Sequence, residues 1–354
     1  MKRNGFLHHA PGIMNRRDFL RLSGMLGIGL ASAGTLFPTG AEAVKFNRRL
    51  YKISKTRLAM GTFVSMTLLH PSRDQAEAAM GEAFLEMDRL AGTISRFDRT
   101  TAVAQLNREG VLKDVPPEVA EVISRALAYY RISDGAFDIS VKPVVDLFKT
   151  AFAQGSQKPP TDTALKEALR LVNASHIEFT GRTVRFKQGG MGITLDGIAK
   201  GYIVDRASQI LSSRGITNHL INAGGDIRTA GHKRDKKPWT IAVQDPNKKK
   251  RYPDIIHLTD GAVATSGNYE VYFDQEKMFH HIVNPRTGQS PNESTSVSVL
   301  ADTAMDADAL STAVFVMTPG RGTRLIDSLP RCESLVLMNG RRKMMSRGWR
   351  SAAV

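Results

Sequence analysis

The chain contains 354 residues, and its 49 Lys and Arg against 34 Asp and Glu give a formal net charge of +15 at pH 7. The one cysteine, Cys332, excludes an intramolecular disulfide framework, so packing must supply the stability. No zinc-finger spacing, aromatic ribonucleoprotein signature or basic helix accompanies the charge, which excludes the common nucleic-acid-binding modules. Much of the surplus lies instead in two loop-like runs, 232–237 and 247–251, where a solvated surface is the expected explanation.

Residues 1–43 have the features of a twin-arginine export signal. Arg16 and Arg17 precede an uncharged Gly/Ala-rich stretch over 22–37, and the segment ends in small residues. A membrane anchor is the alternative, but the stretch is weakly apolar and shorter than the roughly 20 residues that a spanning helix needs. We therefore expect export to the periplasm and one mature domain over 44–354, without a transmembrane segment. Because the leader holds five Lys/Arg and two Asp/Glu, the net charge of this domain falls to +12.

Apolar residues at helical spacing predict four long helices. These cover 72–91, the segment from the Pro116-Pro117 pair to Gly135, 198–211 and 304–317. The last segment is unusual because acidic and hydroxyl side chains interrupt an otherwise apolar run.

Short β-rich runs fill much of the second half of the chain. A hairpin is expected over 177–186, and strands are expected over 219–222, 239–243, 255–258, 280–283 and 296–300. A last hairpin joins 335–338 to 343–345 through Asn339-Gly340, which favours a two-residue turn. Helices and strands mix without regular alternation or repeats, so the predicted class is α+β, with no linker that would separate two domains.

Asp308 and Thr312 are four residues apart in the predicted helix over 304–317. This spacing puts a carboxylate and a hydroxyl on one helix face, where both can point at one hard cation. A buried helix is the alternative, with Thr312 bonded to the preceding turn and Asp308 merely solvated.

The string from Thr194 to Gly201 runs from a strand into a helix. Backbone amides, a glycine carbonyl and the Lys200 ammonium therefore converge there, which suits a phosphate and its metal. A tight turn with a capping Asp196 and a solvated Lys200 is equally compatible with the sequence. The Gly-rich turns at 222–226 and 264–269 lack the spacing of a nucleotide-binding fingerprint and are more simply β-turns.

His280 and His281 precede a Pro/Gly turn that ends at Gly288. A histidine with a pKa near 6.5 can take a proton from an attacking hydroxyl, although a histidine pair on a strand is more often structural.

In this order, the segments resemble the FAD:protein FMN transferase family, the ApbE-like flavin transferases, across nearly all of the mature chain. The matching strings are Met60–Thr62, Ile94–Asp98 leading to Leu106-Asn107, Asp134–Pro143, Gly197–Gly201, Asn222–Asp226, Thr265–Tyr269, His281–Gly288 and Asp308–Thr312. The resemblance implies one large α+β domain, related to the T-fold, with mixed or antiparallel sheets and packed helices.

The resemblance also implies an activity, which is Mg²⁺-dependent transfer of the FMN moiety of FAD to a Ser or Thr hydroxyl of a target protein, with release of AMP. The implied magnesium ligands are Asp308, Thr312 and the carbonyl of Gly197, and the implied general base is His281. The implied FAD contacts are Met60, Phe97, Phe137, Asp138, Ile139, Lys200, Ser266, Gly267, His281 and Ile282. With the export signal, the implied acceptor is an exported redox protein anchored in the inner membrane.

Two positions depart from the family pattern. Thr194 stands where an aspartate is common, with Asp196 in place of the first glycine of a Gly-Gly pair, and Asn284 stands where an aspartate is frequent. These departures keep two alternatives open. One is a carrier that binds FAD without turnover, and the other is a pyrophosphatase that releases FMN and AMP.

Overall fold

The computed structural model describes residues 42–45, 50–153, 158–233, 236–246, 252–268 and 279–350. The predicted leader up to residue 41, the basic run 247–251, residues 234–235 of the other run, and Tyr269 lie outside the described residues. Within the described residues, no helix combines the length and the apolar character needed to cross a membrane.

The described strands are organised around a nine-stranded antiparallel sheet, in the order β1-β2-β3-β7-β8-β11-β12-β13-β14. The strands are β1 (Glu42–Lys45), β2 (Tyr51–Ala59), β3 (Thr62–His70), β7 (Asn218–Ala223), β8 (Asp226–Ala230), β11 (Gly261–Gly267), β12 (Ser294–Ala301), β13 (Glu333–Met338) and β14 (Lys343–Met345). Every neighbouring pair is antiparallel, so the predicted α+β class is confirmed.

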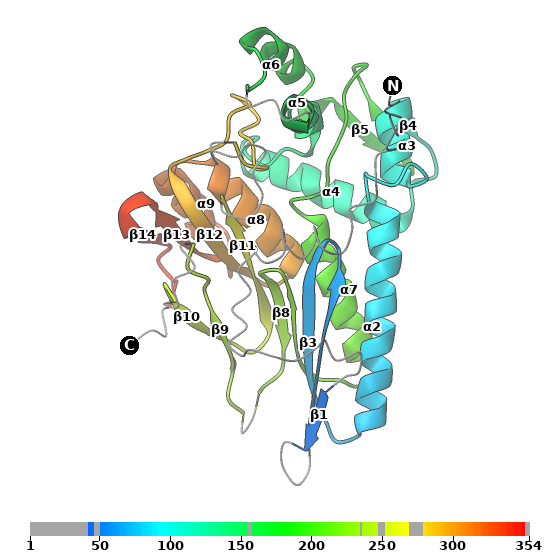
Figure 1. The fold of residues 1–354 in the computed structure, drawn as a ribbon, viewed down its shortest axis with the longest axis vertical. Helices are drawn as coiled ribbons and strands as arrows, with labels where there is room; N and C mark the ends of the chain where they lie inside the picture. Colours follow the sequence, from blue (N-terminus) through cyan, green and yellow to red (C-terminus); the bar gives the residue numbers. More distant parts are fainter. Residues whose placement is uncertain are drawn as a thin grey trace, which may run out of the picture.

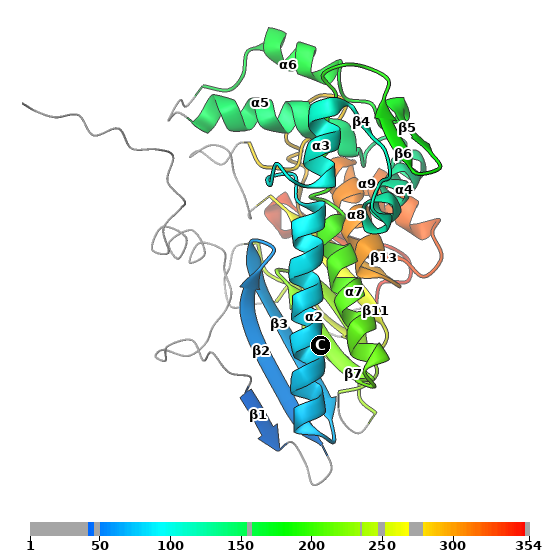
Figure 2. The same ribbon diagram turned by 90° about the vertical axis from the view of Figure 1, so that its right-hand side faces the viewer.

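Helices cover one face of this sheet (Figures 1 and 2). They are α2 (Arg73–Ile94), which packs on β2 and β3, α7 (Ala199–Ser213), which packs on β7 and β8, and α8 (Ala304–Val316), which packs on β11 and β12. α9 (Pro319–Asp327) follows α8. On the other face, the two-stranded sheet of β9 (Trp239–Ala242) and β10 (Ile255–Leu258) closes a smaller apolar cluster that includes Ile241, Ile256 and Trp349.

A second layer of helices and a small sheet lies at one end of the large sheet (Figure 1). It contains α3 (Ala102–Glu109), α4 (Pro117–Ile132), α5 (Lys142–Ala153), α6 (Asp162–Leu169), the 3-10 turns η1 (Ile139–Val141) and η2 (Ala174–His176), and the strands β4 (Val111–Leu112), β5 (Ile177–Thr180) and β6 (Thr183–Phe186). Val119 of α4 and Val184 of β6 belong to the same buried cluster as Val64 of β3. This layer therefore shares the main core, which agrees with one domain.

Side-chain capping marks the starts of α2 and α8. The Ser72 hydroxyl accepts a hydrogen bond from the Gln75 amide at the start of α2, and the Thr303 hydroxyl accepts one from the Asp306 amide at the start of α8. The buried Asp205 of α7 accepts further bonds from the Ala304 and Met305 amides, at 2.9 and 2.8 Å. α8 is apolar on nearly all sides because the sheet and neighbouring helices surround it.

The four predicted helices are confirmed as α2, α4, α7 and α8, and the hairpin over 177–186 is confirmed as β5 and β6. The strand predicted over 280–283 is wrong. The Ser290 hydroxyl accepts a hydrogen bond from the His280 amide and donates one to the His280 carbonyl. The backbone groups of His280 are therefore paired with a side chain and not with a neighbouring strand. The two-residue turn at Asn339-Gly340 is also wrong, because the Met338 amide bonds to the Arg342 carbonyl across a three-residue loop.

The β2–β3 hairpin was not among the predicted elements. Its turn consists of Met60 and Gly61, and both have positive φ, at 51° and 72°. These values are those of a type I′ turn, whose usual Asn-Gly signature is absent here. A bulky side chain such as that of Met60 rarely adopts this conformation, which makes the hairpin tip a candidate functional position.

His219 of β7 is fully buried and hydrogen-bonded at both ring nitrogens. Nδ1 lies 2.9 Å from the Ile216 carbonyl oxygen, and Nε2 lies 2.7 Å from the Ser208 hydroxyl of α7. The carbonyl can only accept, so Nδ1 carries the proton and Nε2 accepts from the serine. Burial lowers the pKa of His219 to about 4.

We expect this histidine to make folding stability pH-dependent. Between pH 6.5 and 4 the folded state binds fewer protons than the unfolded state. The contribution of the neutral His219 imidazole to the free energy of unfolding is therefore complete above pH 6.5 and is lost as pH falls through 4. At pH 5, the wild-type protein should lose about 2 kcal/mol more unfolding free energy, relative to pH 7.5, than His219→Gln does. Urea denaturation at the two pH values measures this difference, and equal losses in both proteins would contradict the assignment.

Candidate functional site

The three predicted metal-binding positions come together at the start of α7 and the middle of α8. A Cβ atom on Gly197 would lie 3.2 Å from the Thr312 hydroxyl oxygen, so the two residues are in contact. Asp308 lies one turn earlier on α8, is buried, and accepts a hydrogen bond from the Gly201 amide at 3.0 Å. The alternative of a solvated Asp308 is therefore wrong.

A second hydroxyl-bearing strand lies against this face of α8. The Ser266 hydroxyl of β11 is 2.8 Å from the Ser311 hydroxyl and 3.3 Å from the Thr312 hydroxyl, and Gly267 follows it at the strand end. The site therefore offers one carboxylate, several hydroxyls and a backbone carbonyl. These hard oxygen donors fit Mg²⁺. Within the described residues, no group of three or more His, Cys, Asp and Glu side chains is placed to hold a metal ion.

Lys200, in the first turn of α7, is directed at the sheet rather than at solvent. Its ammonium lies 3.1 Å from the carboxylate of Asp226, the first residue of β8. Burial raises the pKa of Asp226, and the adjacent ammonium opposes that rise. The alternative of a solvated Lys200 is thus wrong.

The hairpin tip reaches the same region through the turn between β7 and β8. Gly224 and Gly225 in this turn have φ of 63° and 105°, and a Cβ on Gly224 would overlap the side chain of Thr62. The tip that carries Met60 therefore lies against the turn that leads into Asp226.

Phe137, Asp138 and Ile139 lie against the loop before α7. The Phe137 ring contacts the position of Gly197, and the Ile139 carbonyl accepts a bond from the Thr194 amide at 2.8 Å. Asp138 is largely buried and accepts bonds from the Ser140 amide and hydroxyl at 2.7 and 2.6 Å. Burial raises the pKa of Asp138.

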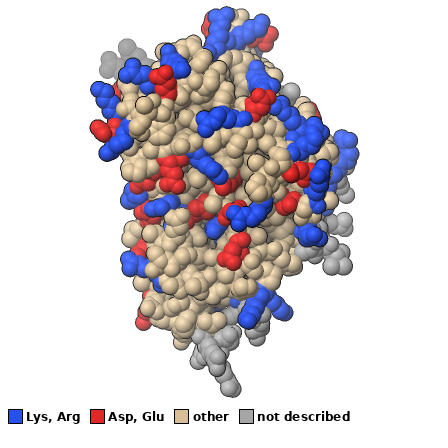
Figure 3. All heavy atoms as spheres, turned by 180° about the vertical axis from the view of Figure 1, so that it is seen from behind, with Lys and Arg blue, Asp and Glu red and all other residues tan. Residues whose placement is uncertain are grey.

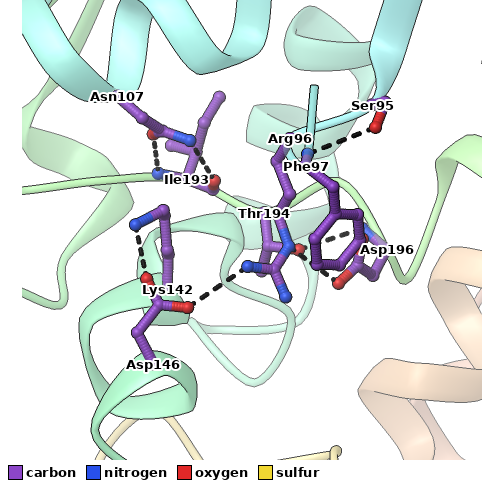
Figure 4. Close-up of polar contacts among 9 residues, drawn as sticks. All are labelled: Ser95, Arg96, Phe97, Asn107, Lys142, Asp146, Ile193, Thr194 and Asp196. Atoms are coloured by element: carbon purple, nitrogen blue, oxygen red, sulfur yellow. Dashed lines mark hydrogen bonds and ion pairs between the residues drawn. The ribbon is translucent and has the colours of Figure 1, made fainter. Parts of the chain in front are cut away.

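Phe97 follows α2, and its side chain is 70% exposed although it is large and apolar. The neighbouring Arg96 is buried and forms ion pairs with Asp196 at 3.1 Å and with Asp146 of α5 at 3.2 Å (Figure 4). Asp196 therefore holds Arg96 and does not cap α7, whose N-cap residue has no side-chain hydrogen bond. Sequence reasoning missed the Arg96 network because its partners are 50 and 100 residues away.

His281 is half-buried, and Ile282 beside it is part of the main core. His280 is buried, with its Nε2 2.9 Å from the Pro291 carbonyl oxygen and its ring edge-on to Phe315 of α8 at 5.5 Å. Phe315 is one turn after Thr312, so the histidine segment packs close to the part of α8 that carries Asp308 and Thr312. The Asn284 side chain accepts bonds from the Arg286 and Thr287 amides, at 2.9 and 3.4 Å, so this turn is supported without a carboxylate.

Two cavities flank these segments. One, of about 470 Å³, brings Asp138 together with Pro285 and Arg286, which follow the histidines. The other, of about 520 Å³, is lined by Asn107, Lys142 and the glycine-rich segment 189–192. The Asn107 side chain makes two hydrogen bonds with the backbone of Ile193, which fixes the chain just before Thr194 (Figure 4). Neither lining includes Asp308 or Thr312.

Basic and acidic side chains alternate over the face seen from behind (Figure 3). The positive charge is not gathered into one basic surface there, which is the distribution that nucleic-acid binding would need.

Comparison with known proteins places these features in a family. The model of the ApbE family matches residues 60–336. A FAD:protein FMN transferase of Vibrio cholerae is 31% identical over 252 residues, covering 69% of this chain and 75% of that protein. One of Treponema pallidum is 28% identical over 322 residues, covering 85% of this chain and 88% of that protein.

Solved structures give the same relationship. The ApbE protein of Thermotoga maritima has a TM-score of 0.76 at 32% identity, over 84% of this chain and 97% of its own. The flavin transferase ApbE of Vibrio cholerae has a TM-score of 0.74 at 26% identity, over 87% of this chain and 98% of its own.

Proposed function

The chain belongs to the ApbE family, and from this premise we propose that it is an FAD:protein FMN transferase. The reaction joins the FMN moiety of FAD to a Ser or Thr hydroxyl of a target protein and releases AMP. The observation that carries the proposal is the convergence of Gly197, Asp308 and Thr312 from two helix regions, next to the Lys200–Asp226 pair.

The residues present fit Mg²⁺, which would be held by the Asp308 carboxylate, the Thr312 hydroxyl and the Gly197 carbonyl. When bound, the cation neutralises charge on the pyrophosphate of FAD. Lys200 supplies a second positive charge. The Asp226 carboxylate, 3.1 Å away, fixes the position of the Lys200 ammonium. The Gly201 amide orients the Asp308 carboxylate by a hydrogen bond to Oδ2. Phosphoryl transfer requires from a protein mainly the positioning of the reacting groups and the neutralisation of charge.

His281 is proposed as the base for the acceptor. It takes the proton of the Ser or Thr hydroxyl as that oxygen attacks the phosphorus of the FMN half. The new O–P bond replaces the bond to the AMP oxygen, and AMP leaves. Met60, Phe97, Phe137, Asp138, Ile139, Ser266, Gly267 and Ile282 are proposed to bind FAD.

The acceptor is proposed to be an exported redox protein anchored in the inner membrane, and the enzyme to act in the periplasm. The twin arginine at Arg16 and Arg17, before an uncharged Gly/Ala-rich stretch, supports this compartment.

The test is incubation of the purified protein with FAD, Mg²⁺ and a candidate acceptor. We expect the acceptor mass to rise by one FMN while AMP appears in equal amount. Free FMN and AMP without acceptor modification would identify a pyrophosphatase, and FAD binding without AMP release would identify a carrier. EDTA should stop the transfer, because the site depends on a divalent cation.

A further inference from the structure

We propose that Arg96 makes the candidate metal site selective for Mg²⁺ over the larger Ca²⁺, by holding Asp196 and through it the carbonyl of Gly197. This inference rests on the proposed function, because it concerns the cation that the transfer would use. Asp196 directly precedes Gly197 and stands where the family pattern has a glycine. The ion pair of Arg96 with Asp196 is therefore a feature of this chain and not of the family pattern. Arg96 is a positioning residue, which acts on the site through its partner.

Gly197 is the one proposed ligand position that lies outside a helix. Asp308 and Thr312 are carried by α8, whose backbone is in direct contact with α7 at Gly201. Gly197 precedes α7, and the N-cap residue of that helix, Ile198, makes no side-chain capping bond. The Gly201 amide, four residues after Gly197, donates its hydrogen bond to Asp308. Contacts outside α7 must therefore fix the Gly197 carbonyl.

Arg96 supplies a charged contact directly beside Gly197. Its side chain is only 5% exposed, and its guanidinium bridges two carboxylates, with Nε 3.1 Å from Asp196 and Nη1 3.2 Å from Asp146 of α5 (Figure 4). The Asp196 side chain is 53% exposed, so packing alone does not fix it. The buried guanidinium is what gives this carboxylate one position, and it ties the residue before Gly197 to α5.

The segment before Asp196 is held by uncharged hydrogen bonds. The Asn107 side chain makes two bonds with the backbone of Ile193, at 2.9 and 2.6 Å (Figure 4). The Thr194 amide donates to a backbone carbonyl of η1 at 2.8 Å, and the Thr194 hydroxyl accepts a bond from the Asp196 amide at 3.3 Å. The chain is therefore fixed as far as the Asp196 amide, and Arg96 adds the restraint that lies next to the ligand.

A fixed carbonyl selects between cations by their size. Mg²⁺ takes oxygen ligands at about 2.0–2.1 Å in near-octahedral geometry, whereas Ca²⁺ takes them at about 2.3–2.6 Å and tolerates irregular geometry. A Cβ on Gly197 would lie 3.2 Å from the Thr312 hydroxyl oxygen, so the ligand groups start close together. If these groups cannot move apart, Ca²⁺ is disfavoured. A site with one mobile carbonyl would accept both cations.

The test measures the dissociation constants of Mg²⁺ and Ca²⁺ for the purified protein without FAD. Each cation displaces bound Mn²⁺, which is followed by electron paramagnetic resonance, and the quantity compared is the ratio of the Ca²⁺ constant to the Mg²⁺ constant. Both cations carry the same charge, so a substitution that only changes the local charge leaves this ratio unchanged. We expect Arg96→Lys and Asp196→Ala each to lower the ratio about tenfold. Lysine keeps the charge of Arg96, but its single nitrogen cannot bridge both carboxylates as the guanidinium does.

The matched control is Arg89→Lys. Arg89 of α2 also bridges two carboxylates, those of Glu86 at 2.8 Å and Glu118 of α4 at 2.6 Å, but neither belongs to the loop before α7. Its replacement should leave the ratio at the wild-type value. The double variant of Arg96→Lys and Asp196→Ala should lower the ratio no further than either single variant, because both remove one contact. Thermal unfolding checks the folding of each variant, and Asp196→Ala, at a half-exposed side chain, carries the test if Arg96→Lys does not fold.

An unchanged ratio in Asp196→Ala would overturn the inference. So would an equal fall in Arg89→Lys, or a wild type that binds Ca²⁺ as tightly as Mg²⁺. Equal affinity of the wild type and Asp308→Asn for Mn²⁺ would also overturn it, because the cation would then lie elsewhere. FMN transfer with Mg²⁺ is measured separately. Transfer by the wild type with an unchanged ratio in the variants rejects only the role of Arg96, and a lowered ratio without any transfer rejects only the transferase.

Discussion

Replacing Asp308 with alanine is expected to abolish Mg²⁺-dependent FMN transfer, lowering its rate by at least about 10³-fold. Asp308 carries the only formal charge among the three proposed metal ligands, so the remaining hydroxyl and carbonyl cannot hold the cation well. The change also removes the acceptor of the Gly201 amide, which is a buried hydrogen bond at 3.0 Å. Asp308→Asn keeps that acceptor and should lose activity to a similar extent with less loss of stability.

The matched control is Asp306→Ala, which removes a carboxylate from the same helix. Asp306 pairs instead with Arg125 of α4 at 2.8 Å, so its loss should leave the Mg²⁺ dependence unchanged. Thr312→Val should be milder than Asp308→Ala, because a neutral hydroxyl contributes less than a carboxylate and valine has a similar shape. Transfer rates are measured against Mg²⁺ concentration. Wild-type turnover of Asp308→Asn at limiting Mg²⁺ would mean that the cation is held elsewhere.

Replacing His281 with asparagine should lower transfer by a factor of about 10² to 10⁴, with FAD affinity little changed. The acceptor hydroxyl has a pKa far above neutrality and must lose its proton as it attacks phosphorus. FAD binding depends on other groups, so the loss should appear in the rate of the transfer step. Single-turnover transfer and an FAD titration without Mg²⁺ separate the two effects.

The control histidine for this experiment is His257, which is exposed on β10. His280 is not a suitable control, because it is buried against Phe315 and its Nε2 lies 2.9 Å from the Pro291 carbonyl oxygen. Replacing His280 should therefore reduce stability, and its effect on transfer would be indirect. A loss in His281→Asn that follows weakened FAD binding would show that the imidazole organises the pocket and that the base is another group.

Helices were the most predictable part of this fold. Residues Ala76, Ala79, Met80 and Ala83 recur on one face of the predicted helix, and in α2 this face is buried in the main core. The β2–β3 hairpin was missed because its turn, Met60-Gly61, lacks a turn signature. The strand expected at His280 failed because a side chain, that of Ser290, satisfies the backbone groups that a strand would have paired.

The candidate site also contains residues that the sequence predicted and contacts that it did not predict. Asp308 and Thr312 were predictable because helical spacing alone puts them on one face. Their neighbour Ser266 and the ion pair of Lys200 with Asp226 depend on which strands and helices pack together, which a single sequence does not specify. Arg96 carried no local signal at all, because both of its carboxylate partners come from distant segments.

Position 201 leaves no room for any side chain. α7 and α8 meet there backbone to backbone, and a Cβ on Gly201 would overlap the carbonyl oxygen of Ala304. The separation of the two helices is therefore fixed by the peptide groups themselves and not by side chains that repack from one sequence to another. Because Lys200 and Asp308 lie next to this contact, core substitutions elsewhere can accumulate without changing the spacing of the ligand groups. A methyl group added at position 201 would force α7 and α8 apart and would therefore change the spacing of the ligand groups.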